Sequence, residues 1–249
     1  MLKGRLAVVT GATRGIGFAT ARELAARGAT VVVCSRDIAS AEKAARRIGK
    51  KAHPASLDVT SAKSVSSFVK KVVADNGRID ILVNNAGYPF DPKIWYKKMH
   101  RVSDEELDAV LAVDLKGTFR ITRAVLPLMV KHRGGVIISI SSTPALAGYT
   151  EGAPYSLAKA GIIAMTKHVA LEYGKDNVRA YVLALGNIAT DATFNSMTDK
   201  AKKVAAQESA MNRWGRPEEV GRTIAGLAGD DFSFATGNTI VVDGGTVLF

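Results

Sequence analysis

Tyr155 and Lys159 are the two residues whose types and spacing most directly suggest catalysis. Four positions apart, they would share one face of a helix. A free phenol releases its proton poorly at neutral pH, but a neighbouring ammonium group favours the phenolate. Such a tyrosine could donate a proton to a ketone oxygen during reduction and take one from an alcohol during oxidation.

Ser142 precedes Tyr155 by thirteen residues and follows the β-branched run 136–141. Its hydroxyl could hydrogen-bond a substrate oxygen as negative charge develops on that oxygen. Ser141 and Ser139 would point to the other face of an extended strand, so we expect them to pack inside the protein. Ser142, Tyr155 and Lys159 are therefore the first catalytic candidates.

A glycine-rich turn, TGATRGIG at residues 10–17, follows the first apolar run. Glycines let a backbone approach a pyrophosphate closely, and the N-terminus of the next helix meets the phosphate charge. The spacing is G-x-x-x-G-x-G rather than the commoner G-x-G-x-x-G. The turn predicts dinucleotide binding, and the alternative is a tight strand-to-helix turn without a ligand.

Short β-branched runs alternate with longer helical patterns along the chain, which predicts βαβ units and a parallel sheet covered on both faces. We expect one α/β domain over residues 1–249, a doubly wound Rossmann fold with seven parallel strands. Its nucleotide-binding half would span about 1–100 and its catalytic part about 101–249. Strands are expected at 6–10, 30–35, 52–57, 79–83, 136–141, 178–185 and 239–242, and helices at 15–27, 39–48, 61–75, 103–131 (bent near Pro127), 154–173 and 217–228. The irregular segments 88–102 and 189–212 are candidate loops over a site.

The net charge of +11 raises the possibility of nucleic-acid binding. The 34 basic residues are spread along the chain, however, which argues against it and fits solvated helix faces or attraction of anionic ligands. The single cysteine, Cys34, excludes an intramolecular disulfide, and no Cys/His cluster suggests a metal site. No apolar run reaches the length of a membrane span, and no signal peptide is visible, so we expect a cytoplasmic protein.

Further motifs accompany the glycine turn and the Ser/Tyr/Lys set: Asp58, NNAG at 84–87, RPEE at 216–219 and VDGG at 242–245. In this combination the chain resembles the short-chain dehydrogenases/reductases over nearly its whole length, and most closely the 3-oxoacyl-carrier-protein reductase group. The resemblance implies an oxidoreductase that transfers a hydride between a nicotinamide and a ketone or secondary alcohol. A 3-oxoacyl thioester, carried by acyl carrier protein or CoA, is the expected substrate. A dehydrogenase of a sugar, steroid or other secondary alcohol stays open, as does a nucleotide-binding regulator with little turnover.

In family members that use NAD, an acidic residue ends the second strand and binds the adenosine ribose. Here Ser35 and Arg36 occupy that place, and Arg14 lies in the glycine turn. Two guanidinium groups suit a 2′-phosphate by charge and geometry. We therefore expect NADP(H), with NAD(H) possible; the alternative is that Arg36 only pairs with Asp37.

The resemblance also assigns cofactor-binding roles elsewhere. Asp58 would bond the adenine amino group, Val59 would lie against the ring, and Lys159 would hold the nicotinamide ribose. The expected cofactor-binding residues are Gly11, Thr13, Arg14, Gly15, Ile16, Gly17, Ser35, Arg36, Asp58, Val59, Asn85, Ala86, Gly87, Tyr155, Lys159, Gly186, Ile188 and Thr190.

The sequence departs from the family pattern at two places. Asp114, within VDLKG, replaces the usual asparagine that supports a proton-relay water. A carboxylate accepts hydrogen bonds but cannot donate through an amide, so Asp114 is a further catalytic candidate with altered water geometry. Leu185-Gly186 replaces the usual Pro-Gly, which relaxes one φ restriction and still permits close approach to the nicotinamide.

The segment 88–101 mixes Phe90, Trp95 and Tyr96 with basic residues. Its aromatic side chains could wall an acyl or ring pocket, or it could be an oligomer contact. By resemblance, residues 189–212 form a substrate lid, the protein is a homotetramer built on the long helices and the apolar C-terminal segment 241–249, and carrier protein docks on basic residues. Candidates for docking are Lys131, His132, Arg133, Lys175 and Arg179.

Overall fold

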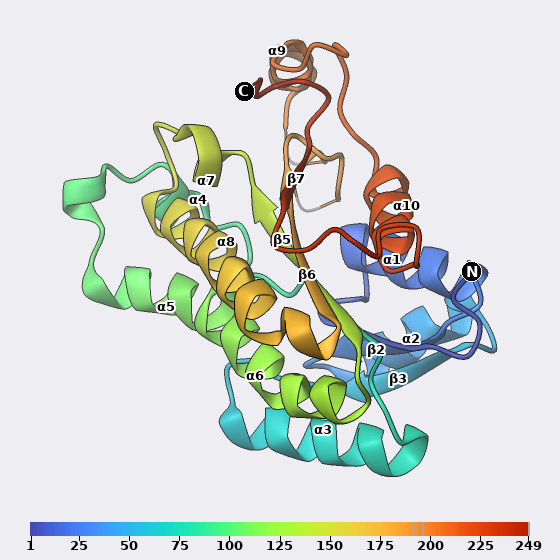
Figure 1. Ribbon diagram of the computed structural model, residues 1–249. Helices are drawn as coiled ribbons and strands as arrows, with labels where there is room; N and C mark the ends of the chain where they lie inside the picture. Colours follow the sequence, from blue (N-terminus) through green and yellow to red (C-terminus); the bar gives the residue numbers. More distant parts are fainter. Residues whose placement is uncertain (192, 196, 249) are drawn as a thin grey trace.

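The computed structural model describes residues 1–191, 193–195 and 197–248. Within them a seven-stranded parallel sheet has the order β3-β2-β1-β4-β5-β6-β7, which confirms the expected doubly wound α/β fold (Figure 1). The strands are β1 (Leu6–Val9), β2 (Thr30–Ser35), β3 (Ala52–Ser56), β4 (Ile81–Asn84), β5 (Gly135–Ser142), β6 (Val178–Leu185) and β7 (Thr239–Val242).

Helices cover both faces of the sheet and give it two apolar cores. One core lies under α1 (Gly15–Ala26), α2 (Ile38–Ile48) and α10 (Pro217–Leu227), and the other under α3 (Ala62–Asn76), α6 (Lys116–Lys131) and α8 (Ala153–Tyr173). Helix α5 (Asp104–Asp114) packs against α8 beside the second core (Figure 1). The strand order reverses between β1 and β4, and ligands of such sheets bind where the carboxyl ends diverge at this point.

The predicted long helix 103–131 is wrong in its continuity. The structure has two helices, α5 and α6, and they separate at Leu115 rather than bending at Pro127. Two tertiary contacts explain the position: Asp114 turns inward to accept a bond from the Tyr88 amide, and Leu115 packs closely against Gly161 of α8. Helix α6 continues through Pro127, because a proline removes one backbone bond but packing retains the rest.

Polar residues at helix starts behave as the sequence predicts. Ser103 and Glu106 form a reciprocal capping box at α5, and Ser61 caps α3. The segments expected to be irregular contain short helices: α4 (Pro92–Trp95), the 3₁₀ turn η1 (Met99–Arg101) and α9 (Asp199–Gln207). Helix α7 (Pro144–Ala147) and the 3₁₀ turn η2 (Gly174–Asp176) are further short elements that the pattern does not predict.

Among the described residues, none of the helices combines the length and apolar character that a membrane crossing requires. Cys34 is buried in β2, and burial raises the pKa of its thiol, so it has the character of a packed small side chain rather than a nucleophile.

Candidate active site

A cleft of about 1400 Å³ opens at the carboxyl ends of the strands. All the candidate residues from the glycine turn to Thr190, including Ser142, Tyr155, Lys159 and Asp114, line this cleft. They come from loops that follow β1 to β6 and from α5 and α8, so residues more than 170 positions apart converge on one space.

The glycine turn is held between β1 and β4 by side-chain bonds. The Thr10 hydroxyl accepts from the amides of Asn85 and Ala86 at 3.0 and 2.9 Å, and the Asn85 side chain donates to the carbonyls of Thr10 and Gly11. A Cβ at Gly17 would lie 2.3 Å from the Gly11 carbonyl oxygen. Glycine is therefore required there by the fold itself, and the turn presents its backbone and the start of α1 to the cleft.

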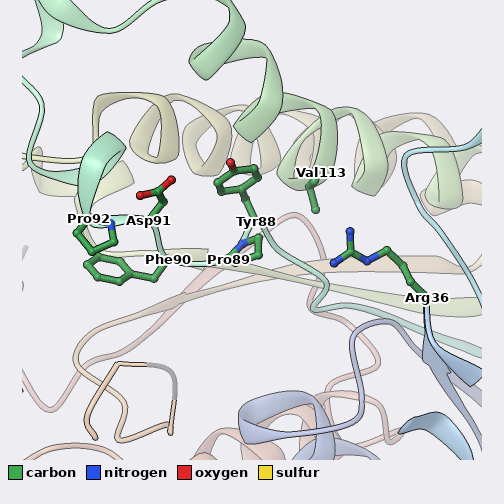
Figure 2. A pocket seen from close by; sticks show the side chains of 7 residues that line it. All are labelled: Arg36, Tyr88, Pro89, Phe90, Asp91, Pro92 and Val113. Atoms are coloured by element: carbon green, nitrogen blue, oxygen red, sulfur yellow. The ribbon is translucent and has the colours of Figure 1, made fainter. Parts of the chain in front are cut away.

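The end of the cleft beside β2 and β3, where the sequence predicts that adenosine binds, carries Arg14, Ser35, Arg36 and Asp58. Arg36 extends from the end of β2 toward the loop 88–92, and with it lines an adjoining pocket of about 370 Å³ (Figure 2). Asp37 uses its carboxylate to cap α2, and the Ser40 hydroxyl lowers its pKa. Within the described ranges no ion pair joins Arg36 to Asp37, so pairing with its neighbour does not occupy the arginine.

Asp58 is partly buried and accepts bonds from the Thr60 amide and hydroxyl at 2.9 and 2.7 Å. The hydroxyl is the main reason that the pKa of Asp58 lies below its usual range, with Arg36 and Arg120 adding smaller effects. Arg120 also donates to the Val59 carbonyl at 2.7 Å. Asp58 thus stays ionised as an acceptor at neutral pH.

Lys159 lies next to Tyr155 on α8, with its Nζ 5.3 Å from the centre of the phenol ring. The ammonium group is buried and donates to the Ile140 carbonyl at 3.2 Å. Ser142 lines the cleft and donates to the Leu185 carbonyl at 3.1 Å. Ser141 also borders the cleft but is buried, and its hydroxyl donates to the Lys159 carbonyl, so the alternation along β5 leaves Ser142 as the more exposed of the two serines.

Asp114 is 1% exposed and bonds two parts of the site. One carboxylate oxygen accepts from the Tyr88 amide at 2.7 Å. The other lies 3.9 Å from Lys159 Nζ and has no hydrogen-bond partner among the described residues. A buried carboxylate with a free oxygen beside an ammonium group is an electrostatic partner for Lys159 as well as a brace for the loop after β4.

Several residues that the motifs do not single out also organise the site. Asn187 donates to the Ala205 carbonyl and to Glu208, which joins the loop after β6 to α9. Trp214 donates to the Lys202 carbonyl and packs against Phe194. The segment 189–212 is thus anchored over the cleft at several points; Ala192 and Ser196 of the expected lid lie outside the described residues.

The structure changes the explanation for Gly186 and the expected role of Arg179. A Cβ at Gly186 would lie 2.6 Å from the Cβ of Asp243, so packing of the C-terminal segment already requires glycine there. Arg179, a candidate for carrier docking, is buried, and its guanidinium donates to the Tyr181 hydroxyl and to three backbone carbonyls of the loop 227–232. Arg179 is therefore a structural residue and is unsuitable for docking.

Comparisons with known proteins agree with this geometry. A family model described as "Enoyl-(Acyl carrier protein) reductase" matches residues 11–247. The chain is 39% identical over 250 residues to a 3-oxoacyl-[acyl-carrier-protein] reductase of Thermotoga maritima, and 99% of each protein is covered. The chain belongs to the short-chain dehydrogenase/reductase family.

Similar short-chain dehydrogenase/reductase relatives occur in other bacteria. A reductase of the same name from Escherichia coli is 37% identical, with 99% of this chain and 98% of the relative covered. One from Aquifex aeolicus is also 37% identical, with 98% of each covered. As a member of this family, the chain is an oxidoreductase that acts on CH–OH groups.

Proposed function

We propose that this protein is an NADP(H)-dependent reductase of 3-oxoacyl thioesters. The observation that carries the proposal is the convergence of Ser142, Tyr155 and Lys159 with a glycine turn in one cleft. The relatives named 3-oxoacyl-[acyl-carrier-protein] reductase at 35–39% identity over the whole chain support this substrate class.

The cleft fits a dinucleotide by its shape and donors. A side chain at Gly17 would collide with the turn, and the resulting bare backbone opens onto the start of a twelve-residue helix, as a pyrophosphate requires. The turn 11–17 would hold the pyrophosphate, Asp58 and Val59 the adenine, and Lys159 the nicotinamide ribose. Asn85, Ala86, Gly87, Gly186, Ile188 and Thr190 would complete the wall. A bound nicotinamide supplies or accepts the hydride.

The chain's own residues handle the proton and the developing charge. Tyr155 donates its hydroxyl proton to the ketone oxygen in reduction and takes one in alcohol oxidation. The ammonium group of Lys159, 5.3 Å from the centre of the phenol ring, stabilises negative charge that develops on the tyrosine oxygen during proton transfer. Ser142 stabilises the substrate oxygen through its hydroxyl, which exchanges the Leu185 carbonyl for that oxygen.

Arg14 and Arg36 support a preference for NADP(H). Both line the adenosine end of the cleft, and the position that carries an acidic residue in NAD-dependent relatives is Ser35. Guanidinium groups bind a phosphate in a bidentate manner and contribute charge. The same site could bind NAD(H) less tightly.

The partners proposed are a thioester-linked carbonyl substrate and further copies of the same chain. Carrier docking would use Lys131, His132, Arg133 or Lys175, now that Arg179 is committed to the fold. A homotetramer is supported by apolar side chains exposed on the long helices: Phe119, Leu157 and Leu171. We also propose a cytoplasmic location, in line with a buried free thiol.

The deciding experiment measures oxidation of NADPH and of NADH with acetoacetyl-CoA, acetoacetyl carrier protein, small diketones and cyclic ketones. We expect the thioesters and NADPH to give the highest kcat/KM. Tyr155→Phe should lower kcat by at least ~10²-fold, since it removes the proton donor. Arg36→Ala should raise the KM for NADPH while leaving that for NADH nearly unchanged.

Other outcomes would contradict parts of the proposal. A preference for NADH would reject the role of the two arginines. Turnover of cyclic alcohols or sugars but not of thioesters would favour the alternative secondary-alcohol dehydrogenase. Undiminished turnover by Tyr155→Phe, or NADPH binding without turnover of any carbonyl compound, would reject the proposed mechanism and favour a nucleotide-binding regulator.

A further inference from the structure

An aromatic cluster, formed by Phe90, Trp95, Tyr96 and Tyr149, stands beside the catalytic tyrosine. The Trp95 ring lies 5.4 Å from the ring of Tyr155 at an interplanar angle of 60°. The ring centres of Tyr149 and Phe90 lie 6.3 and 5.7 Å from the ring centre of Trp95. The rings of Phe90 and Tyr96 meet edge-on. All these rings line the cleft.

The indole of Trp95 is fixed in its orientation by contacts with the segment before α8. The indole Nε1 donates to Glu151 at 3.0 Å, and the backbone carbonyl of Trp95 accepts from the Gly152 amide at 2.8 Å. A Cβ at Gly152 would lie 2.7 Å from the indole ring, so only glycine leaves room for it. The ring therefore forms a preorganised wall, and a ligand can contact it without first ordering it.

The start of α4 fixes the backbone that carries Trp95, whose amide donates to the Asp91 carbonyl at 2.9 Å. Asp91 caps the helix by accepting from the Lys93 amide, and Pro92 occupies its first turn. At the far end of the segment, Lys97 forms an ion pair with Glu106 of α5 at 2.5 Å. Residues 88–97 are thus attached to α5 at both ends, through the Tyr88 amide with Asp114 and through Lys97 with Glu106.

The remaining cleft wall near α9 is different in character. It contains the aliphatic side chains Met197, Ala201 and Val204. Lys200, Glu208 and the indole of Trp214 also line this part of the cleft, so the aliphatic wall meant here is the surface of those three side chains. Aromatic rings prefer edge-to-face or offset contacts with other rings, which gain free energy beyond the burial of apolar area. A ketone that carries one planar and one non-planar group on its carbonyl carbon would therefore place the planar group against the aromatic cluster and the other against the aliphatic wall.

We propose that Trp95 is a specificity-determining residue and that the aromatic cluster receives a planar aryl group attached to the reacting carbonyl carbon. This inference rests on the proposed function, because it assumes that Tyr155 marks the position of the carbonyl. Within the proposed class of 3-oxoacyl thioesters, it selects those with an aryl group at C3, and the corresponding 3-oxo esters are their simple analogues. The saturated arm of the ester then extends along the aliphatic wall.

The test compares ethyl benzoylacetate with ethyl 3-cyclohexyl-3-oxopropanoate, which have rings of equal carbon number but different planarity. The ratio of their kcat/KM values is measured for the parent enzyme, Trp95→Leu, Trp95→Phe and Trp214→Leu, with ethyl acetoacetate as a small reference. Comparing ratios between variants cancels the intrinsic reactivity of the two ketones. Trp214 is the matched control, because it also lines the cleft but packs on Phe194 and α9.

We expect Trp95→Leu to lower the aryl-to-cyclohexyl ratio by about fivefold, the effect of one aromatic pair. Trp95→Phe should keep most of the ratio, and Trp214→Leu should change both esters alike. An unchanged ratio in Trp95→Leu would overturn the inference while the proposed function stands. The proposed function would instead be overturned if the parent enzyme reduced neither these esters nor acetoacetyl-CoA and acetoacetyl carrier protein.

A second measurement needs no substitution and guards against a misfolded variant. Benzamide and cyclohexanecarboxamide carry carbonyl groups that the enzyme cannot reduce, and their inhibition constants are measured on the parent enzyme with ethyl acetoacetate as substrate. Should the parent turn over no ester, their dissociation constants are measured calorimetrically on its NADPH complex. Benzamide should bind severalfold more tightly; equal constants would contradict an aryl-binding wall.

Discussion

Asp114 is a buried carboxylate in the cleft, at a position where the resemblance to the family predicts an amide. One of its oxygens lies 3.9 Å from the ammonium group of Lys159. Removal of one partner of a buried ion pair leaves an uncompensated charge, which costs on the order of 3–5 kcal/mol in well-buried cases. We propose that Asp114 supports proton relay and holds Lys159 in place.

Substitution of Asp114 separates these two roles. Asp114→Asn removes the counter-charge of Lys159 but keeps an acceptor for the Tyr88 amide, so it should lower the melting temperature and keep more of kcat than Asp114→Ala does. Asp114→Ala removes that acceptor and the counter-charge of Lys159, so it should lower both kcat and the melting temperature. The measurements are kcat from pH 5 to 10 and thermal unfolding. If both variants keep the parent's kcat at every pH, Asp114 has no part in the mechanism.

For single residues, the sequence predicts the position of a side chain where local helix or strand geometry determines it. Tyr155, Lys159 and Ser142 could be placed because a helix fixes a four-residue spacing and a strand alternates its faces. The contact of Trp95 with Glu151, and of Asn187 with Glu208, joins separate loops, and no periodic pattern encodes such contacts. The ion pair of Asp114 with Lys159 is non-local for the same reason.

Among the elements, α10 shows how charge fixes a helix start beside the cleft. Glu219 accepts two bonds from Arg213 at 2.7 and 2.9 Å and one from the Arg216 amide. The bond from Arg213 is the largest cause that lowers the pKa of Glu219 to about 2. These bonds connect Arg213, which directly follows the segment 189–212, to a helix that packs on α1.

Glu219→Gln should lower the melting temperature at pH 7 by about 2 °C. Because the carboxyl pKa is depressed in the folded protein, its stabilisation is complete above the ordinary value of 4.5 and is lost as the pH falls toward about 2. The difference from the parent should therefore shrink below pH 4.5 in scanning calorimetry. Glu218→Gln is the control, since it removes only an exposed pair with Arg22. A difference independent of pH would contradict this account.

Element boundaries show what the sequence pattern can predict. Long helices and buried strands were predictable within about two residues because hydrophobic periodicity and caps mark them. Helix α4 has four residues and α9 has nine with no buried side chain among them, so neither produces a strong apolar stripe. The separation of α5 from α6 depends on Asp114 and Leu115 contacting other segments.

For the whole molecule, the exposed apolar side chains on the long helices support the proposed contact between copies of the chain. Leu171 on α8 is 86% exposed and Phe119 on α6 is 49% exposed, and these helices pack side by side. Apolar groups of this kind are stabilised by burial against a partner. The apolar C-terminal segment is the second expected contact; its last residue, Phe249, lies outside the described residues.

Size-exclusion chromatography with light scattering should give the mass of a tetramer. Leu171→Asp should shift this mass toward smaller species, because a charge would be buried at the contact. Met99→Asp is the matched control, since Met99 is 73% exposed but lies outside the long helices. A monomeric parent enzyme would contradict the proposed assembly.

The cleft is built from regular elements of the sheet layer and from irregular outer segments. Tyr155, Lys159 and Ser142 are carried by a long helix and an inner strand of the sheet, whereas residues from 88–101 and from the segment 189–212 supply outer walls of the cleft. A change of ligand range therefore needs no change in the sheet. Exchange of the two outer segments between homologous chains could give new substrate ranges while the machinery for proton transfer is inherited intact.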